Sequence, residues 1–345
     1  MQKMNKTLTP VSLFYLYPIH TQHLGFIHCI LHSMRPFLLL TFFVLYVSCT
    51  DKYDKYKNPP EYITKPSASN AAYFEAYDET LKLWNVSFEE LYIPTTNGIA
   101  HVIVSGPKNA EPVVLLHGMN ASSTMWYPNI GSLTKNHRVF AIDFILEAGK
   151  SYLQNDIESV EKVTDWYKEV LFALELDSFH VIGASRGGWL AVNLALDDQK
   201  KIKSLLLLSP AQTFTWIKPS TDLLKNIVTI LSSKEKQIAQ SLESMSSNVA
   251  NISDAYLKQY KIGAKMDSEN KFVTSMQPFS NDELKSLQMP VLVLIGDDDM
   301  INEKRTVAIA NTLPKGKGEV IQNAGHFLSI DQAETVNKKM LDFLK

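Results

Sequence analysis

The stretch that constrains the fold most runs from Phe179 to Ala191, where an apolar segment ends in Gly183-Ala184-Ser185-Arg186-Gly187. The β-branched residues before the first glycine predict a buried strand, and the Ala- and Leu-rich residues after the second predict a helix. Because so sharp a turn brings strand and helix too close for side chains, it explains both Gly183 and Gly187. We therefore expect Ser185 at the tip of the turn, in strained backbone geometry, with its hydroxyl at the carboxyl edge of a sheet.

Strand and helix patterns alternate after a first helix, which we expect to be capped by Asn70 and to bury the aromatic side chains between Tyr73 and Trp84. Asn97-Gly98 is a hairpin signal, and the later apolar runs are continuous, which is typical of a parallel sheet covered by helices on both faces. The expected strands, besides the one that ends at Ala184, cover 90–94, 99–104, 113–116, 138–142, 202–208, 291–295 and 319–321, and the expected helices cover 123–133, 158–176, 188–196, 302–312 and 331–344.

The alternation stops between residues 211 and 287. This segment is rich in Ser, Lys, Gln and Met, its apolar residues recur at helical spacing, and it shows no strand pattern. We interpret it as a helical cap inserted into one α/β domain that spans residues 70–345.

The first 48 residues contain no Asp or Glu, and an apolar run covers residues 36–48. This run is too short to span a bilayer as a helix, but it fits the apolar part of an export signal that starts at Met34-Arg35. Its end at Cys49 resembles the lipidation site of bacterial lipoproteins, which predicts an exported protein tethered to the membrane. An uncleaved anchor, or a buried apolar segment in a cytoplasmic protein, stays open.

Residues 49–69 are polar and rich in proline. This composition is typical of a tether between the export segment and the domain. The alternative is an ordered extension that packs on the domain.

The composition excludes several kinds of partner. The chain has 34 basic and 36 acidic residues and no long basic block, so we expect no nucleic-acid partner. The two cysteines are Cys29 and Cys49, both at or before the expected processing site. The domain should therefore need no disulfide and no cysteine metal site, and we expect no metal and no cofactor.

A serine hydroxyl at the carboxyl edge of a sheet becomes a nucleophile only when a base takes its proton and an acid orients that base. His326 follows the last predicted strand and is the expected base. His101 and His180 lie within predicted strands and are expected to be structural, and His137 is expected in a polar loop. The acid is expected to be one of three consecutive residues, Asp297, Asp298 and Asp299, which follow the strand before.

The loop after the strand at 113–116 begins with His117, Gly118 and Met119. Acyl transfer places negative charge on a carbonyl oxygen, which aimed backbone N–H groups stabilise. We expect the N–H groups of Met119 and Arg186 to form this oxyanion hole. His117 and Gly118 should shape the loop without acting as acid or base.

These motifs resemble the α/β-hydrolase superfamily over residues 90–345, with its chain order of Ser, Asp and His. The family's acid motif falls on Gly296 to Asp299, which implies Asp299 as the catalytic acid. Residues 123–130, 141–143 and 148–151 are similar to small bacterial carboxylesterases. The resemblance implies an esterase that uses Ser185, His326 and Asp299. We expect small to medium apolar esters as substrates, because large apolar side chains lie in or near the loops and the cap that could form the pocket.

Other chemistry on the same fold stays open. Thioester, lactone or carbon–carbon bond hydrolysis would use the same three residues, and a ligand-binding receptor could keep the fold with little turnover. Arg186 departs from the Met, Leu or Gln of many relatives, so it would either favour an acidic substrate or pair with a carboxylate of the cap. The pocket is expected to include Trp126, Trp189, Trp216 and Met276.

Overall fold

The computed structural model describes residues 51–217, 234–266 and 275–345, and a compact unit begins at Tyr53. The predicted export segment, including Cys49, lies outside the described residues. Within the described ranges, no helix is long and apolar enough to span a membrane.

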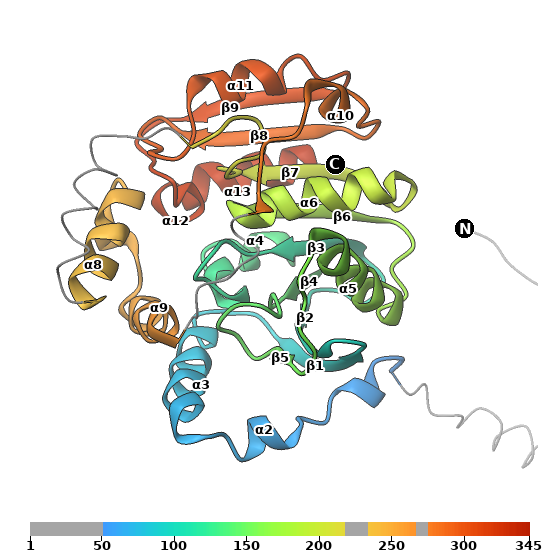
Figure 1. Ribbon diagram of the computed structural model, residues 1–345, viewed down its shortest axis with the longest axis vertical. Coiled ribbons are helices and arrows are strands. Elements are labelled where there is room, and N and C mark those ends of the chain that lie inside the picture. The colour runs from blue at the N-terminus through green and yellow to red at the C-terminus, as the bar shows by residue number, and fades with distance from the viewer. Residues whose placement is uncertain (1–50, 218–233, 267–274) are drawn as a thin grey trace, which may run out of the picture. The chain divides into compact units, whose positions relative to one another are not determined.

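A nine-stranded sheet forms the centre of this unit (Figure 1). The strands are β1 (Phe88–Thr95), β2 (Gly98–Ser105), β3 (Glu111–Leu116), β4 (His137–Ile142), β5 (Tyr152–Leu153), β6 (Phe179–Ala184), β7 (Ile202–Leu208), β8 (Val291–Gly296) and β9 (Gly316–Ile321). Strands β1 and β2 form the predicted antiparallel hairpin, and short β5 joins β2 at its edge. The remaining strands run parallel in the order β4-β3-β6-β7-β8-β9. The mostly parallel sheet that the sequence predicts is confirmed.

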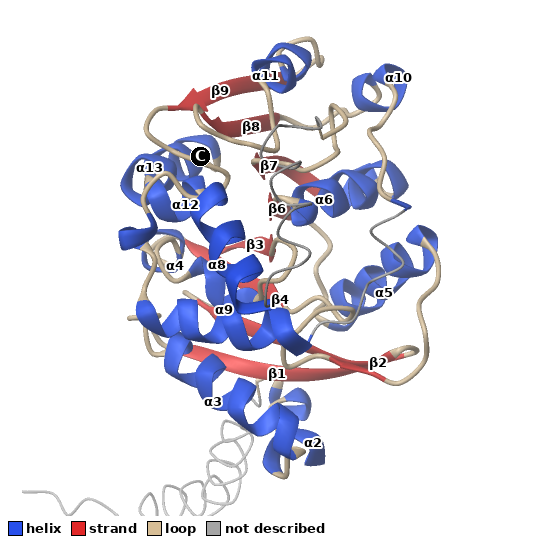
Figure 2. Ribbon diagram, turned by 60° about the vertical axis from the view of Figure 1, so that its left-hand side comes forward, coloured by secondary structure: helices blue, strands red, loops and turns tan. Residues whose placement is uncertain are grey.

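Helices cover both faces of the sheet (Figure 2). One apolar core lies under α5 (Val160–Ala173), α6 (Arg186–Asp197), α10 (Asn281–Lys285) and α11 (Lys304–Ala310). The other joins the opposite face to α3 (Ala68–Leu81), α4 (Ile130–Leu133), α8 (Lys234–Met245), α9 (Asp254–Met266), α12 (Leu328–Asp331) and α13 (Ala333–Phe343). The described part of the predicted cap thus contributes α8, α9 and the 3₁₀ turn Val249–Asn251 to the second core.

From Tyr53 on, the segment predicted as a tether packs against the domain, which is the alternative that the sequence left open. The Tyr53 side chain is buried, and its hydroxyl donates to the carbonyl of Leu174 at 2.9 Å. Tyr62 stacks on Tyr152 with ring centroids 4.8 Å apart. The segment also contains a 3₁₀ turn at Asp54–Tyr56 and α2 (Glu61–Thr64). Tyrosines within the polar composition supply the apolar surface that docks it.

Three predicted helices differ in detail. The expected helix at 123–133 is a 3₁₀ turn, Ser123–Trp126, followed by the short α4, since Pro128 cannot continue a helix. The last helix, expected at 331–344, is α13, and the short α12 precedes it. Helix α3 starts before Asn70 because Ser67 caps it, accepting the N–H of Asn70, and the buried aromatic stripe of this helix is confirmed.

Candidate active site

Ser185 lies at the tip of the turn between β6 and α6, with φ 51° and ψ −118°, a conformation that L-residues rarely adopt. A Cβ on Gly183 would stand 2.3 Å from the carbonyl oxygen of Gly187, and one on Gly187 would stand 2.1 Å from that of Leu116. Glycine is therefore required at both positions. The strained turn thus presents the Ser185 hydroxyl at the carboxyl edge of the sheet.

The structure brings the Ser185 and His326 side chains together although 141 positions separate them in sequence. Nε2 of His326 lies 2.9 Å from Oγ of Ser185, and Nδ1 lies 3.0 Å from Oδ1 of Asp299. His326 follows β9 and Asp299 follows β8, so each reaches the carboxyl edge of the sheet from its own loop. The three side chains form one hydrogen-bonded series that links a hydroxyl, an imidazole and a carboxylate.

The Asp299 carboxylate is buried, and both of its oxygens accept hydrogen bonds. Its Oδ1 also accepts the N–H groups of Ile301 at 2.9 Å and Asn302 at 3.2 Å, and its Oδ2 accepts the Asn302 amide at 3.0 Å. Burial raises the pKa of Asp299, but the charge and hydrogen bond of His326, together with the Ile301 N–H, outweigh burial and lower it below the ordinary value. The carboxylate is thus held ionised beside the imidazole.

Asp297 and Asp298 do not touch His326. Asp297 is exposed and accepts the N–H of Ala324 at 3.0 Å, while the backbone N–H of Asp298 donates to the Ala324 carbonyl. Helix α11 begins at Lys304 after Glu303 without a side-chain cap, so none of the three aspartates caps it. Asp297 instead supports the loop that carries His326.

The predicted oxyanion loop lies directly against the serine. A Cβ on Gly118 would stand 3.3 Å from Cβ of Ser185. Among the described residues, neither the N–H of Met119 nor that of Arg186 is used in a backbone hydrogen bond. Both groups are therefore available to a substrate oxygen.

Both ring nitrogens of His117 are used in hydrogen bonds to the backbone. Its Nε2 accepts the N–H of Phe144 at 2.8 Å, which leaves the proton on Nδ1 to donate to the carbonyl of Gly118 at 2.8 Å. Burial, aided by the positive charge of Arg186, lowers the pKa of His117, so the ring is neutral. His117 thus joins the loop after β3 to the loop after β4 and has no free nitrogen for proton transfer.

Arg186 is fully buried and pairs with Glu147. Its guanidinium carbon also lies 4.5 Å from the centre of the Phe144 ring. The sequence offered an acidic substrate or a cap carboxylate as its partner. In the structure the partner is a carboxylate of the loop after β4 and not of the cap, since Glu147 pairs with Arg186.

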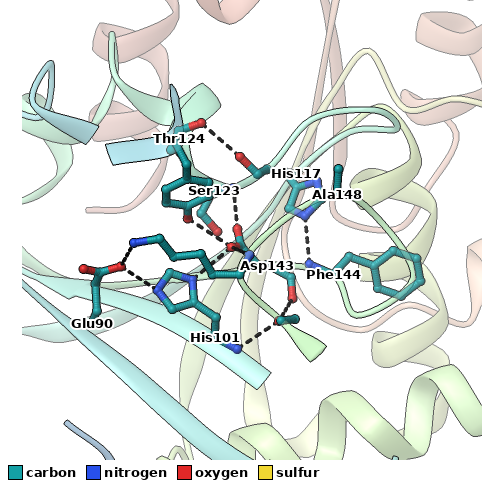
Figure 3. A network of polar contacts seen from close by, with 12 residues as sticks. Glu90, His101, His117, Ser123, Thr124, Asp143, Phe144 and Ala148 are labelled. Carbon is teal, nitrogen blue, oxygen red and sulfur yellow. Dashed lines mark hydrogen bonds and ion pairs between the residues drawn. The ribbon is translucent and has the colours of Figure 1, made fainter. Parts of the chain in front are cut away.

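Asp143, at the end of β4, is the centre of a buried polar network (Figure 3). Its carboxylate accepts the N–H of Ser123 at 2.8 Å and lies 2.9 Å from Nδ1 of His101, whose Nε2 lies 3.0 Å from Glu90. Asp143 also accepts the Tyr77 hydroxyl at 3.0 Å. The network joins β1, β2, β4 and α3 to the turn that follows the oxyanion loop, and His101 is structural, as expected.

This network also changes the pKa values of its members. Burial by itself would lower the pKa of His101, but the hydrogen bonds and charges of Asp143 and Glu90 outweigh it and raise the pKa. Burial opposes ionisation of Glu90 as well, yet His101 and Lys150 lower its pKa to about 2. The cluster is therefore most stable with a protonated imidazole between two carboxylates.

Our sequence analysis assigned no role to Asp143, Glu147 or Asp331. Asp143 carries the same signal as the run Asp297 to Asp299, since it is an acidic residue directly after a buried parallel strand. Asp331, at the end of α12, accepts the N–H groups of Gly325 and Ser247 and so joins the His326 loop to the cap. Neither it nor Glu147 has a sequence signal, because each acts on a segment distant in the chain.

An apolar cavity of ≈ 140 Å³ opens beside Ser185 and His326. Cap helices contribute Met245, Tyr256 and Tyr260, and the remaining walls come from the ends of β6 and β7, from sheet-edge loops and from α12. The other lining residues are Gly118, Met119, Asn120, Ala121, Met125, Ala184, Leu208, Ala211, Ile217, Ile301, Phe327, Leu328, Ser329 and Ile330.

The four side chains predicted to form the pocket do not line this cavity. Trp126, Trp189 and Met276 are buried in the apolar cores, and Trp216 is 62% exposed. A large apolar residue near a loop is as readily a core residue as a pocket residue, and the sequence pattern does not distinguish them. In the described part of the chain, no group of three or more His, Cys, Asp or Glu side chains could hold a metal ion.

Comparison with known proteins identifies the family. The profile described as "alpha/beta hydrolase fold" matches residues 111–240. Carboxylesterase YbfK of Bacillus subtilis (strain 168) is 32% identical over 286 residues, which cover 80% of this chain and 94% of that protein. The crystal structure of naproxen esterase (carboxylesterase NP) from Bacillus subtilis superposes with a TM-score of 0.75 at 33% identity and covers 81% of this chain and 99% of that one.

A more distant structure, a membrane phospholipase A, matches with a TM-score of 0.69 over 92% of this chain at 17% identity and supports the fold alone. With its mostly parallel sheet, the sharp turn at Ser185 and relatives above 30% identity, the chain belongs to the α/β-hydrolase superfamily and is similar to small bacterial carboxylesterases.

Proposed function

We propose that this hydrolase cleaves carboxylic esters through an acyl-enzyme formed on Ser185. One observation carries the proposal: the hydrogen-bonded series from Ser185 through His326 to Asp299 lies at an apolar cavity. The similarity to carboxylesterases supports the ester as the substrate bond.

In the first half of the reaction, Oγ of Ser185 attacks the ester carbonyl carbon while its proton passes to Nε2 of His326, 2.9 Å away. The carbonyl oxygen becomes an oxyanion, which accepts the N–H groups of Met119 and Arg186. The carbon–oxygen bond to the alcohol then breaks, and the leaving alkoxide takes the proton from His326. The acyl group remains on Ser185 as an ester.

In the second half, a water molecule attacks the acyl carbon and gives its proton to His326. The second tetrahedral intermediate collapses, Ser185 regains the proton, and the carboxylic acid leaves. Asp299 stays ionised throughout, orients the imidazole through Nδ1 and stabilises the imidazolium in both halves.

The cavity sets the size and polarity that we propose for the substrate. A volume of ≈ 140 Å³ is close to the ~150 Å³ of an apolar cavity that holds benzene. Its walls are mainly aliphatic and aromatic, and the charge of Arg186 is neutralised by Glu147. Neutral esters with short acyl or single-ring groups therefore fit better than long-chain lipids.

Burst kinetics with p-nitrophenyl acetate and p-nitrophenyl butyrate test the proposal. Wild-type protein should release about one p-nitrophenol per chain in a burst, followed by steady turnover. Ser185→Ala should lose both phases, and Ser286→Ala, which changes an exposed serine beyond α10, should retain them. A burst that survives in Ser185→Ala would refute the serine mechanism, and a burst without further turnover would favour the receptor alternative.

Hydrolysis of thioesters, lactones and carbon–carbon bonds has to be tested with separate substrates, since the same three residues could catalyse each reaction. Rates for matched acyl groups in oxygen ester, thioester and lactone form rank these reactions. We expect the oxygen ester to give the highest kcat/KM, because it is the bond that the relatives at 32% and 33% identity are named for.

We also propose that residues 34–49 direct export and that Cys49 is lipidated, although both lie outside the described residues. The apolar composition of 36–48 and the small residue Ser48 before Cys49 support this. Cys49→Ala should move the protein from the membrane pellet to the soluble fraction with its esterase activity unchanged, since one cysteine would carry all the acyl chains. Equal partitioning of both forms would contradict lipidation.

A further inference from the structure

We propose that Glu147 is a positioning residue for the oxyanion hole, because its one buried carboxylate holds the segments that carry both N–H donors. This inference rests on the proposed ester hydrolysis and names a residue that governs its rate. Glu147 would touch neither the substrate nor the reacting atoms. It would act through the loop at Met119 and through Arg186.

On one side, Oε2 of Glu147 accepts the backbone N–H of Asn120 at 2.7 Å. Asn120 has φ 57°, in the left-handed region that asparagine tolerates better than most residues. Met119, the first oxyanion donor, is the residue before it. The hydrogen bond therefore fixes the loop immediately after the donor.

On the other side, Oε1 of Glu147 pairs with Nη1 of Arg186, whose backbone N–H is the second donor. The Arg186 and Glu147 side chains are only 0% and 4% exposed. Removing one member of such a buried pair leaves a charge without its partner, which is costly in a folded protein. Both ends of the oxyanion hole thus depend on the same carboxylate.

The planarity of the peptide bond connects these contacts to the first donor. The carbonyl of Gly118 and the N–H of Met119 belong to one trans peptide, so they point in opposite directions. That carbonyl is held by Nδ1 of His117 at 2.8 Å and faces Nη2 of Arg186 at 3.5 Å. Since Glu147 holds the Arg186 guanidinium in place, it fixes the direction of the Gly118 carbonyl and, with it, the Met119 N–H.

An ion pair with only a structural role can be distinguished from a positioning residue by its effects on stability and on kcat. Its loss would lower stability but leave the turnover of each folded molecule unchanged. Loss of a positioning residue should lower kcat with little effect on KM, because the oxyanion exists only in the transition state and the tetrahedral intermediates.

The test compares Glu147→Gln and Glu147→Ala with the control Glu169→Ala. The control removes a carboxylate that also accepts a loop N–H, that of Thr96 at 2.7 Å, at the β1–β2 hairpin. Since one oxyanion donor is worth ~10²–10³ in kcat, we expect Glu147→Ala to lower kcat ~100-fold with KM within ~3-fold. Glu147→Gln keeps an acceptor for Asn120 and the side-chain shape, so its loss should be ~10-fold. The control should keep its kcat.

Two further readouts exclude a general disturbance of the site. Trifluoromethyl ketones add to the serine as a tetrahedral oxyanion, so their Ki should rise by about the factor by which kcat falls. The pH profile of kcat/KM should keep its midpoint, because the contacts between His326 and Asp299 are untouched. Concentrations of folded sites come from fluorophosphonate titration, so misfolded protein does not count as lost turnover.

Wild-type levels of kcat and Ki in folded Glu147→Gln and Glu147→Ala would overturn the inference while leaving the proposed esterase intact. Should the wild type hydrolyse no ester, the proposed function fails, and amide hydrogen exchange then decides the inference. Exchange at Asn120 should be at least ~10-fold faster in Glu147→Ala, and an unchanged rate would overturn the positioning role.

Discussion

Asp299→Asn should lower turnover only through the loss of the negative charge, because the hydrogen-bond donors around the carboxylate determine the orientation of the asparagine amide. Oδ1 of Asp299 accepts three N–H groups, those of Ile301 at 2.9 Å, Asn302 at 3.2 Å and His326 Nδ1 at 3.0 Å. In Asp299→Asn an NH₂ group placed there would face three donors. The amide oxygen should therefore take that position, so His326 keeps the tautomer that leaves Nε2 free to accept the serine proton.

The magnitude follows from the lost attraction between the carboxylate and the imidazolium. Two unit charges ~4 Å apart attract by ~4 kcal/mol at an effective dielectric constant of ~20. At ~1.4 kcal/mol for each factor of ten, Asp299→Asn should lower kcat ~10³-fold. This loss is below the ~10⁴-fold reported for a triad in which the neutral residue also reverses the tautomer.

The assay is steady-state hydrolysis of p-nitrophenyl acetate, with active sites counted from the burst. Asp297→Asn is the matched control, since Asp297 is exposed and its amide oxygen could still accept the Ala324 N–H. It should change kcat about threefold at most. Equal losses in the two variants, or a loss below tenfold in Asp299→Asn, would refute the assignment of Asp299 as the acid.

Three further predictions concern the cap, the cavity and the buried network. Asp331→Ala removes the acceptor for Gly325 and for two cap residues, so the free energy of unfolding should fall by about 3 kcal/mol in denaturant titration. A loss below about 1 kcal/mol would contradict a stabilising connection between the cap and the His326 loop through Asp331. Ala121→Phe should fill part of the cavity and lower kcat/KM for butyrate more than for acetate, and an unchanged ratio would place the acyl group elsewhere. Since the pKa of His101 is raised, its protonated form adds stability below its ordinary pKa of ~6.5, and this contribution disappears as the pH rises through the raised value. The difference in free energy of unfolding between wild type and His101→Gln should therefore shrink as the pH rises from 6 to 9, and a constant difference would contradict the protonated state.

Local sequence patterns were sufficient to predict the strands and the sharp turn at Ser185. Continuous apolar runs locate β3, β6 and β7 because each is buried on both faces, and the glycines beside Ser185 are required by backbone contacts that any such turn makes. His326 and the Asp297 to Asp299 run could be assigned to the same sheet edge, since parallel strands place their carboxyl ends together.

Tertiary contacts determine what the sequence pattern missed. Glu147 and Arg186 meet although 39 positions separate them, and nothing in either local sequence indicates the pairing. The cavity walls depend on where the cap helices lie, so Tyr256 and Tyr260 line the cavity while Trp126 packs in the core. Of the two interpretations left open for residues 49–69, the packed extension holds from Tyr53 on, because Tyr53 and Tyr62 dock on the domain in spite of the polar composition.

Covalent labelling tests the central claim most directly. The wild-type protein, treated with a fluorophosphonate, digested and mapped by mass spectrometry, should carry one adduct per chain on the peptide that contains Ser185. Prior incubation with p-nitrophenyl butyrate should slow labelling, and Ser185→Ala should carry no adduct. An adduct on another residue, or labelling that persists in Ser185→Ala, would contradict Ser185 as the nucleophile of this hydrolase.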